Sequence, residues 1–149
     1  MNIRTFQDSD FDAIAGIYSL SKLDEFRYEN GRFELLPLEK DEERLREMME
    51  SRIFVYDDGG ILGYGAVLEN EIQALYVHPL SRGRGIGKRL LEHLISQTGA
   101  SATLYVAKNN VPAKVMYQKY DFMVTKEFET SYNGTWVLAN EMVREAGYG

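Results

Sequence analysis

A glycine-rich, basic stretch near the middle of the chain has the residue types of an anion-binding loop. It reads R-G-R-G-I-G-K at residues 82–88, after an apolar run at 75–77 and before an amphipathic run that continues to about residue 97. Glycines let a backbone approach a ligand closely and adopt positive φ. The helix start that follows would expose N–H donors and the positive end of its dipole. This combination predicts a cradle for a pyrophosphate, with basic side chains around it.

The spacing of the glycines separates this loop from two common nucleotide-binding motifs. A G-x-G-x-x-G motif would need a third glycine where the chain has Lys88 or Leu90, and a P-loop would need Ser or Thr in place of Arg89. The pattern from Arg82 to Gly87 is R-x-x-G-x-G, which is similar to the acyl-CoA-binding motif of the GNAT superfamily of N-acetyltransferases. The alternative is a strand–helix turn without a ligand, in which three glycines would be costly.

A second stretch has residues spaced to share one face of a short helix. It reads N-V-P-A-K-V-M-Y at residues 110–117 and continues Q-K-Y-D-F. Asn110 is a natural N-cap, and Ala113 and Tyr117 lie on one helix face, where the small residue leaves room beside the phenol. The stretch resembles the N-x-x-A-x-x-x-Y-x-x-x-G-F segment of the same superfamily. Asp121 replaces its glycine, and we expect this change to be neutral because Asp tolerates the left-handed conformation.

The resemblance implies an acetyl-CoA-dependent N-acetyltransferase in which Tyr117 is the general acid that protonates the departing thiolate. It also implies that a backbone N–H of the fourth strand, which we expect to be that of Val77, stabilises the oxyanion. The structural alternatives are a core tyrosine at Tyr117 and a simple helix cap at Asn110. The residues that the resemblance implies for acetyl-CoA binding are Leu75, Tyr76, Val77, Arg82, Gly83, Arg84, Gly85, Ile86, Gly87, Lys88, Asn110 and Tyr117; no metal is implied.

Several candidates remain for the general base that an amine acceptor requires. Counted back from Arg82, Glu71 matches the base of the histone acetyltransferase branch, and period two places Glu71, Gln73 and Leu75 on one face of a strand. The ribosomal-protein acetyltransferase branch has a glutamate five residues before the asparagine, where this chain has Tyr105. Three alternatives to Glu71 as the base stay open. Glu71 could be only a solvated turn carboxylate, His78 could be the base, or a chain of waters could remove the proton.

The composition of the chain excludes several reaction mechanisms and types of metal site. The chain has 149 residues, which fits one domain over residues 1–149, and no cysteine, which excludes disulfides, an acyl-thiol intermediate and Cys-ligated zinc. We therefore expect direct attack in a ternary complex and a cytoplasmic location. No signal peptide or membrane-spanning run is visible, and two histidines are too few for a His-rich metal site.

The net charge of −6 argues against nucleic acid as a partner and is compatible with a cationic acceptor. Acids in the segment that covers the acceptor site in this family could attract an ammonium group, or could simply form a solvated face: Asp24, Glu25, Glu29 and Glu34. We expect His93 to lie on a solvated helix face. The chain could be a monomer or a homodimer.

Periodicity and turn residues predict the elements that must position these motifs. Strands are expected at 3–6, 53–56, 61–68, 72–77, 102–107, 122–128 and 135–142. The first helix is expected to begin at an N-cap within Asp8-Ser9-Asp10. Further helices are expected at 39–51, with an apolar stripe of Leu45, Met48 and Met49, at 85–97 and at 111–119. Residues 21–38 are expected to be irregular. The order β-α-α-β-β-β-α-β-α-β-β matches the GNAT fold, an α/β (α+β) class with a mixed, mostly antiparallel sheet of about six to seven strands and about four helices.

The sequence thus predicts an enzyme that moves the acetyl group of acetyl-CoA to a primary amine on a small molecule, a peptide N-terminus or a lysine. Splaying of the fourth and fifth strands would open the slot for the pantetheine arm. The alternative is a non-catalytic acyl-CoA-binding or regulatory module on the same fold.

Overall fold

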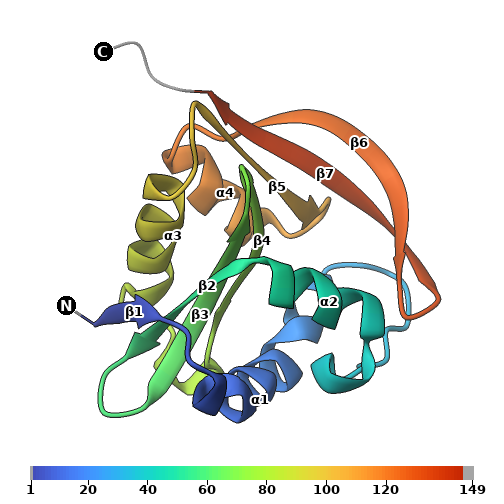
Figure 1. Cartoon of the computed structure of the whole chain (residues 1–149). Coiled ribbons are helices and arrows are strands. Elements are labelled where there is room, and N and C mark those ends of the chain that lie inside the picture. The colour runs from blue at the N-terminus through green and yellow to red at the C-terminus, as the bar shows by residue number, and fades with distance from the viewer. Residues whose placement is uncertain (1, 146–149) are drawn as a thin grey trace.

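Seven strands form one mixed sheet with helices on both faces in the computed structural model, which describes residues 2–145 (Figure 1). The elements are β1 (Ile3–Thr5), α1 (Phe11–Ser21), α2 (Glu42–Glu50), β2 (Arg52–Asp57), β3 (Ile61–Leu68), β4 (Glu71–Val77), α3 (Ile86–Ser96), β5 (Ser101–Ala107), α4 (Val111–Lys119), β6 (Met123–Tyr132) and β7 (Thr135–Glu145). Short 3₁₀ turns are η1 (Asp8–Asp10), η2 (Lys22–Phe26), η3 (Leu38–Lys40) and η4 (Pro79–Ser81). The predicted element order and fold class are confirmed.

The sheet consists of two antiparallel halves that are joined weakly. Its strand order is β1-β2-β3-β4-β5-β7-β6. β1 to β4 pair antiparallel, as do β5, β7 and β6. The central pair, β4 and β5, is parallel and is in register only at Glu71 and Thr103. Beyond that point the two strands diverge, as Figure 1 shows, and the middle of the sheet is open.

Two apolar layers hold the helices to the sheet. α1 and α2 cover one face through a cluster that includes Ile14, Tyr18 and Met48. α3 covers the other face, where Leu91 and Leu94 pack against β3, β4 and β5. α3 is also the crossover that joins the parallel strands β4 and β5, and it begins directly after the glycine-rich loop. The fold therefore places that loop at the open end of the sheet.

Two local predictions were wrong. Met49 is 59% exposed, so the stripe of α2 consists of Leu45 and Met48 only. Asp10 does not cap α1 with its side chain. Instead its buried carboxylate accepts hydrogen bonds from the Arg4 guanidinium at 2.8 and 2.9 Å and from the Gln7 N–H at 2.8 Å. A bidentate arginine is a stronger partner for a carboxylate than one helix N–H group.

Among residues 2–145, no helix has both the length and the apolar character needed to cross a membrane. Over the same residues, His, Asp and Glu side chains do not gather in a group of three or more that could hold a metal ion.

Candidate active site

Backbone donors face the opening between β4 and β5. The His78 N–H donates to the Leu62 carbonyl at 2.8 Å, and in this register Gly63 pairs with Val77 and Gly65 with Leu75. Because hydrogen-bonded and non-hydrogen-bonded pairs alternate along an antiparallel ladder, the amides of Leu75 and Val77 point away from β3. The Ser21 hydroxyl of α1 donates to the Val77 carbonyl at 3.3 Å, which agrees with this orientation. Two N–H groups of β4 are thus available to a ligand in the opening.

One cavity, called here the loop cavity, lies where the glycine-rich loop meets α4, and has a volume of about 550 Å³. It contains eleven of the twelve residues predicted to bind the cofactor: Leu75, Tyr76, Val77, Arg82, Gly83, Gly85, Ile86, Gly87, Lys88, Asn110 and Tyr117. The exception is Arg84, which lies outside the lining with its guanidinium 3.8 Å from the Asp58 carboxylate. The structure therefore brings both sequence motifs to one cavity.

The loop has the backbone of an anion cradle. Gly83 and Gly85 have φ of 81° and 79°, in the left-handed region that favours glycine. A Cβ atom at either position would meet no protein atom within 4 Å, so both glycines face open space. Gly85 is the N-cap of α3, whose first N–H groups have no acceptor within the helix. Arg82 is held beside this loop by the Asp24 carboxylate at 2.7 Å.

Asn110 occupies the N-cap position of α4, but its side chain makes no capping hydrogen bond. The helix uses the Asn110 carbonyl, which accepts from the Lys114 N–H at 3.1 Å. The expectation of a side-chain cap was therefore wrong. Asp121 has φ of 69°, so the left-handed conformation expected at this position is confirmed.

A second cavity, the sheet cavity, has a volume of about 490 Å³ and lies between β4, β5, the β6–β7 hairpin, η2 and α2. Glu25, Leu75, Tyr76 and Tyr117 line both cavities. We call the place where these four residues meet the junction. A ligand that extends along the loop cavity would present its end, at the junction, to whatever occupies the sheet cavity.

Tyr117 is positioned at the junction by α4. Its ring packs edge-on against Phe122, with centroids 6.1 Å apart. Burial, and secondarily the charge of Glu25, raises the pKa of the Tyr117 phenol, which is therefore protonated at neutral pH. Because Tyr117 lines both cavities, its phenol is a proton donor at the place where they meet.

Glu71 lies at the closed end of the opening, where β4 and β5 still pair. Its carboxylate lines the sheet cavity and accepts a hydrogen bond from Gln73 Nε2 at 2.6 Å. Burial raises the pKa of Glu71, and the negative charges of Glu47 and Glu141 raise it further. Glu71 is therefore a half-buried carboxylate with increased basicity rather than a fully solvated turn residue.

The expectation that Glu71, Gln73 and Leu75 share one face was wrong for Leu75. Ala66 pairs with Ala74, and Val67 pairs with Ile72, so Gln73 is the extra residue of a β-bulge. A bulge shifts the alternation by one residue. Leu75 consequently packs toward α3 together with Ile72.

Neither histidine lines the two cavities. His78 Nδ1 accepts a hydrogen bond from the Leu80 N–H at 3.1 Å and so caps η4. His93 packs edge-on against Phe54 at 4.5 Å, and burial lowers its pKa. The expectation of a solvated His93 was wrong because α3 turns this side chain onto β2.

The acids expected to attract an ammonium group are mostly engaged in other contacts. Asp24 pairs with Arg82, and Glu25 pairs with Lys22. Glu29 accepts from the backbone N–H and Nδ2 of Asn109, both at 3.0 Å. Glu34 is exposed and lines neither cavity. The contacts of Asp24 and Glu29 fix η2 and the chain after it over the site.

Among the residues of the sheet cavity that sequence reasoning missed are four charged or polar ones: Lys22, Arg44, Glu47 and Tyr132. Lys22 is only 5% exposed; burial lowers its pKa, and the Glu25 carboxylate opposes this effect. Arg44 and Glu47 belong to a strongly charged helix whose sequence resembles any solvated helix. None of the four belongs to a motif, so the signal lies in the fold alone.

Comparisons with known proteins identify the family of the chain. A family model described as an acetyltransferase (GNAT) domain matches residues 49–124. The chain is 35% identical over 83 residues to the mycothiol acetyltransferase of Corynebacterium glutamicum, covering 50% of this chain and 28% of that protein. It is 32% identical over 77 residues to the peptidyl-lysine N-acetyltransferase YjaB of Salmonella typhimurium, covering 52% of each. The chain thus spans about half the length or less of these two relatives.

Among solved structures, yncA of Salmonella typhimurium, described with its cofactor acetyl-CoA, superposes with a TM-score of 0.72 at 19% identity. The match covers 100% of this chain and 95% of that one, and it shows the common fold. Because the family model spans half of the sequence, including the glycine-rich loop and the helix with Tyr117, the chain belongs to the GNAT acetyltransferase family.

Proposed function

We propose that the protein is an acetyl-CoA-dependent N-acetyltransferase that acetylates a primary amine by direct attack in a ternary complex. The observation that carries this proposal is the meeting of the loop cavity and the sheet cavity at Tyr117 and Leu75. The named relatives support it, since both are acetyltransferases. A thioester bound along the loop cavity would end where an amine in the sheet cavity can reach it.

The loop cavity fits the parts of acetyl-CoA. Gly83, Gly85 and the first N–H groups of α3 would receive the pyrophosphate. The Val77 amide would pair with the pantetheine arm in the manner of an added strand, and the uncommitted Asn110 side chain lies along the same path. Arg84, outside the lining, would contribute only to the surrounding charge.

The junction supplies each element of acyl transfer. The neutral amine attacks the thioester carbonyl and forms the new C–N bond, while the negative charge moves to the carbonyl oxygen. The Leu75 amide would stabilise this oxyanion in place of the Val77 amide that the resemblance implies, because Leu75 lies at the junction and Val77 lines only the loop cavity. Glu71, directly or through water, takes the proton lost by the amine. As the C–S bond breaks, Tyr117 donates its proton to the thiolate.

Release of free thiol from acetyl-CoA in the presence of an amine panel tests the proposed function. We expect amine-dependent release that requires the intact protein, with stoichiometric N-acetylated product by mass spectrometry. Tight CoA binding without thiol release for any primary amine, free or on a peptide, would show a binding module instead of an enzyme.

Gly85→Val should weaken CoA binding by about tenfold to a hundredfold, because a β-branched residue with positive φ costs about 1–3 kcal/mol and its side chain would enter the cradle. Gly59→Val is the matched control. Gly59, in the β2–β3 turn, also has positive φ, 73°, and open space beside it, but it lines neither cavity. Calorimetry should show near wild-type CoA affinity for Gly59→Val only. Equal affinities in the two variants would contradict the cradle assignment.

A further inference from the structure

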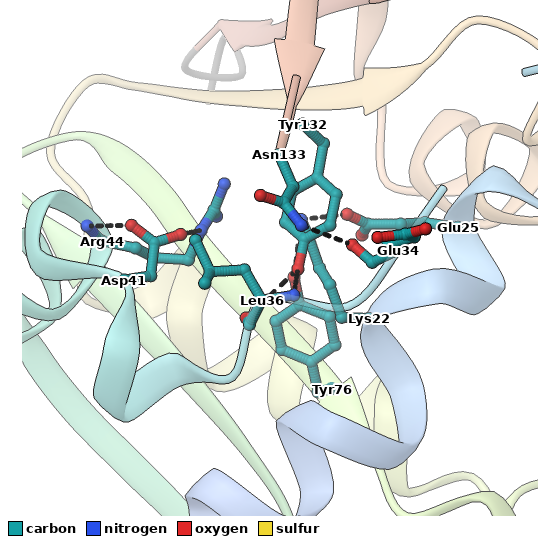
Figure 2. A network of polar contacts seen from close by, with 9 residues as sticks. All are labelled: Lys22, Glu25, Glu34, Leu36, Asp41, Arg44, Tyr76, Tyr132 and Asn133. Carbon is teal, nitrogen blue, oxygen red and sulfur yellow. Dashed lines mark hydrogen bonds and ion pairs between the residues drawn. The ribbon is translucent and has the colours of Figure 1, made fainter. Parts of the chain in front are cut away.

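The sheet cavity has a basic side formed by residues of η2, α2 and the β6–β7 hairpin. The ring of Tyr132 lies 5.1 Å from Lys22 Nζ and 5.9 Å from the guanidinium carbon of Arg44. The Tyr132 hydroxyl is fixed in turn by Leu36, whose N–H donates to it at 2.9 Å and whose carbonyl accepts from it at 3.2 Å (Figure 2). Two cations from distant parts of the chain are thus held against one rigid ring.

Arg44 carries the less satisfied of the two charges. Its Nε is buried and has no hydrogen-bond partner among residues 2–145. The nearest carboxylate, Asp41, is 3.5 Å from Nε and accepts the backbone N–H of Arg44 at 3.2 Å, which caps α2. A guanidinium has five donors in a planar fork that matches carboxylate and phosphonate oxygens. Arg44 therefore lines the cavity with a buried donor that has no hydrogen-bond partner in the described part of the chain.

Lys22 adds a second cation to the basic side, at the edge of the junction. It pairs with Glu25, and its Nζ lies 3.4 Å from the Tyr76 hydroxyl. Both partners line the junction, so the basic side begins next to the reacting centre.

Two carboxylates also line the cavity. Glu71 belongs to β4 and Glu47 lies one turn after Arg44 on α2, and the charge of Glu47 contributes to the basicity of Glu71. Lys126, the third cation of the lining, lies 3.6 Å from the Glu141 carboxylate and is compensated by it. The cavity thus offers both a cation, Arg44, and a basic carboxylate, Glu71, within the volume of a small-molecule site.

We infer that the acceptor is a small zwitterion of the amino-acid type, whose anionic group binds Arg44 and Lys22 while its amine lies on the side of Glu71. This inference rests on the proposed function and names the substrate class of the same site. It narrows the primary amine predicted from the sequence, and three of the four acids that could attract an ammonium group are paired with Arg82, Lys22 and Asn109.

The test compares amines that differ only in the anionic group. Common α-amino acids, their carboxamides, the corresponding decarboxylated amines and the corresponding 1-aminoalkylphosphonates are supplied with acetyl-CoA, and kcat/KM is measured for each. A charge-assisted pair with Arg44 should favour the anionic member of a series by about 10- to 100-fold. Comparison of the 1-aminoalkylphosphonates with the amino acids shows whether the anion-binding part of the cavity prefers a carboxylate or a larger tetrahedral anion.

Arg44→Gln should reduce this preference to about threefold or less, mainly through KM for the anionic acceptor. Arg46→Gln is the matched control, since Arg46 lies on the same helix, is exposed and lines neither cavity. The control should keep the full preference. CoA affinity should be the same in both variants, because Arg44 does not line the loop cavity.

Binding of each compound to the CoA-saturated protein is measured by calorimetry alongside turnover, so the inference is tested independently of catalysis. If decarboxylated amines, carboxamides or lysyl peptides bind and react as well as the amino acids, the inference is overturned while the acetyltransferase activity stands. If zwitterions bind through Arg44 but no thiol is released, the proposed function fails and the anionic subsite stands. Absence of any Arg44-dependent binding overturns the inference directly.

Discussion

Glu71→Gln should lower kcat at neutral pH by roughly 10²- to 10⁴-fold while leaving acetyl-CoA affinity close to that of the wild type. The substitution removes the proton acceptor but keeps an amide oxygen that can still accept the hydrogen bond from Gln73. Glu71 lines the sheet cavity and not the loop cavity, so CoA binding has no reason to change. Single-turnover rates with saturating acetyl-CoA, and calorimetry with CoA, measure the two quantities.

The pH profile should identify Glu71 more specifically than the rate alone. A base acts in its deprotonated form, so kcat falls as pH drops through its pKa. Burial and the charges of Glu47 and Glu141 raise the pKa of Glu71, which places this acid limb above the ordinary carboxylate value of about 4.3. The limb should be absent in Glu71→Gln, whose residual rate has no carboxylate to protonate.

Glu69→Gln provides the control, because Glu69 is an exposed residue of the β3–β4 turn and lines neither cavity. It should keep both the wild-type kcat and the wild-type acid limb. A loss of less than threefold in Glu71→Gln, with the limb intact, would assign proton removal to a chain of waters. His78 would be a poor substitute, since its Nδ1 caps η4.

The parts of the site that sequence predicts are those encoded by local spacing. Positive φ at Gly85 and a helix start directly after it depend only on neighbouring residues, and the structure has both. The same holds for the left-handed Asp121 at the end of α4. The spacing of apolar residues predicts the helices and strands in the order that the structure has, because each spacing marks the buried face of one element.

The parts that sequence did not predict depend on pairing between distant segments. The bulge at Gln73 arises from the register of β4 against β3, and it moves Leu75 to the other face. Asp10 was expected to cap a helix, but Arg4 lies across from it in β1 and takes its carboxylate. Local sequence shows which hydrogen bonds a side chain is able to make. The residues that pack beside it in the fold determine which of these bonds it makes.

The residues on the acceptor side of the site could not be predicted either, because they too come from distant segments of the chain. Arg44 belongs to a helix with acids and arginines on most of its surface, and a solvated face was the simplest interpretation. Only the fold shows that it meets Lys22 at Tyr132, 88 residues further along the chain from Arg44 and on another element. The segments that recognise the acceptor share no motif, so no spacing in the sequence could reveal their meeting.

Tyr117→Phe should lower kcat by roughly 10- to 1,000-fold and leave the melting temperature nearly unchanged. The thiol of CoA, with a pKa near 8.5 like that of other thiols, is a moderate leaving group, so its protonation accelerates the reaction without being indispensable. The ring and its edge-on contact with Phe122 remain in the variant. Tyr117 lines both cavities, so we expect the loss of its hydroxyl to change the junction and not the core packing.

Tyr56→Phe should show the reverse pattern and serves as the matched control. The buried Tyr56 hydroxyl accepts hydrogen bonds from Asn2 at 2.9 Å and Arg89 at 3.1 Å, and Tyr56 lines neither cavity. Loss of that hydroxyl should cost about 1–3 kcal/mol of unfolding free energy, because two donors lose their acceptor, while kcat stays near the wild-type value. Melting temperature and single-turnover rate are measured on the same preparations. A Tyr117→Phe protein that is destabilised like Tyr56→Phe but fully active would exclude Tyr117 as the general acid and make it a core tyrosine.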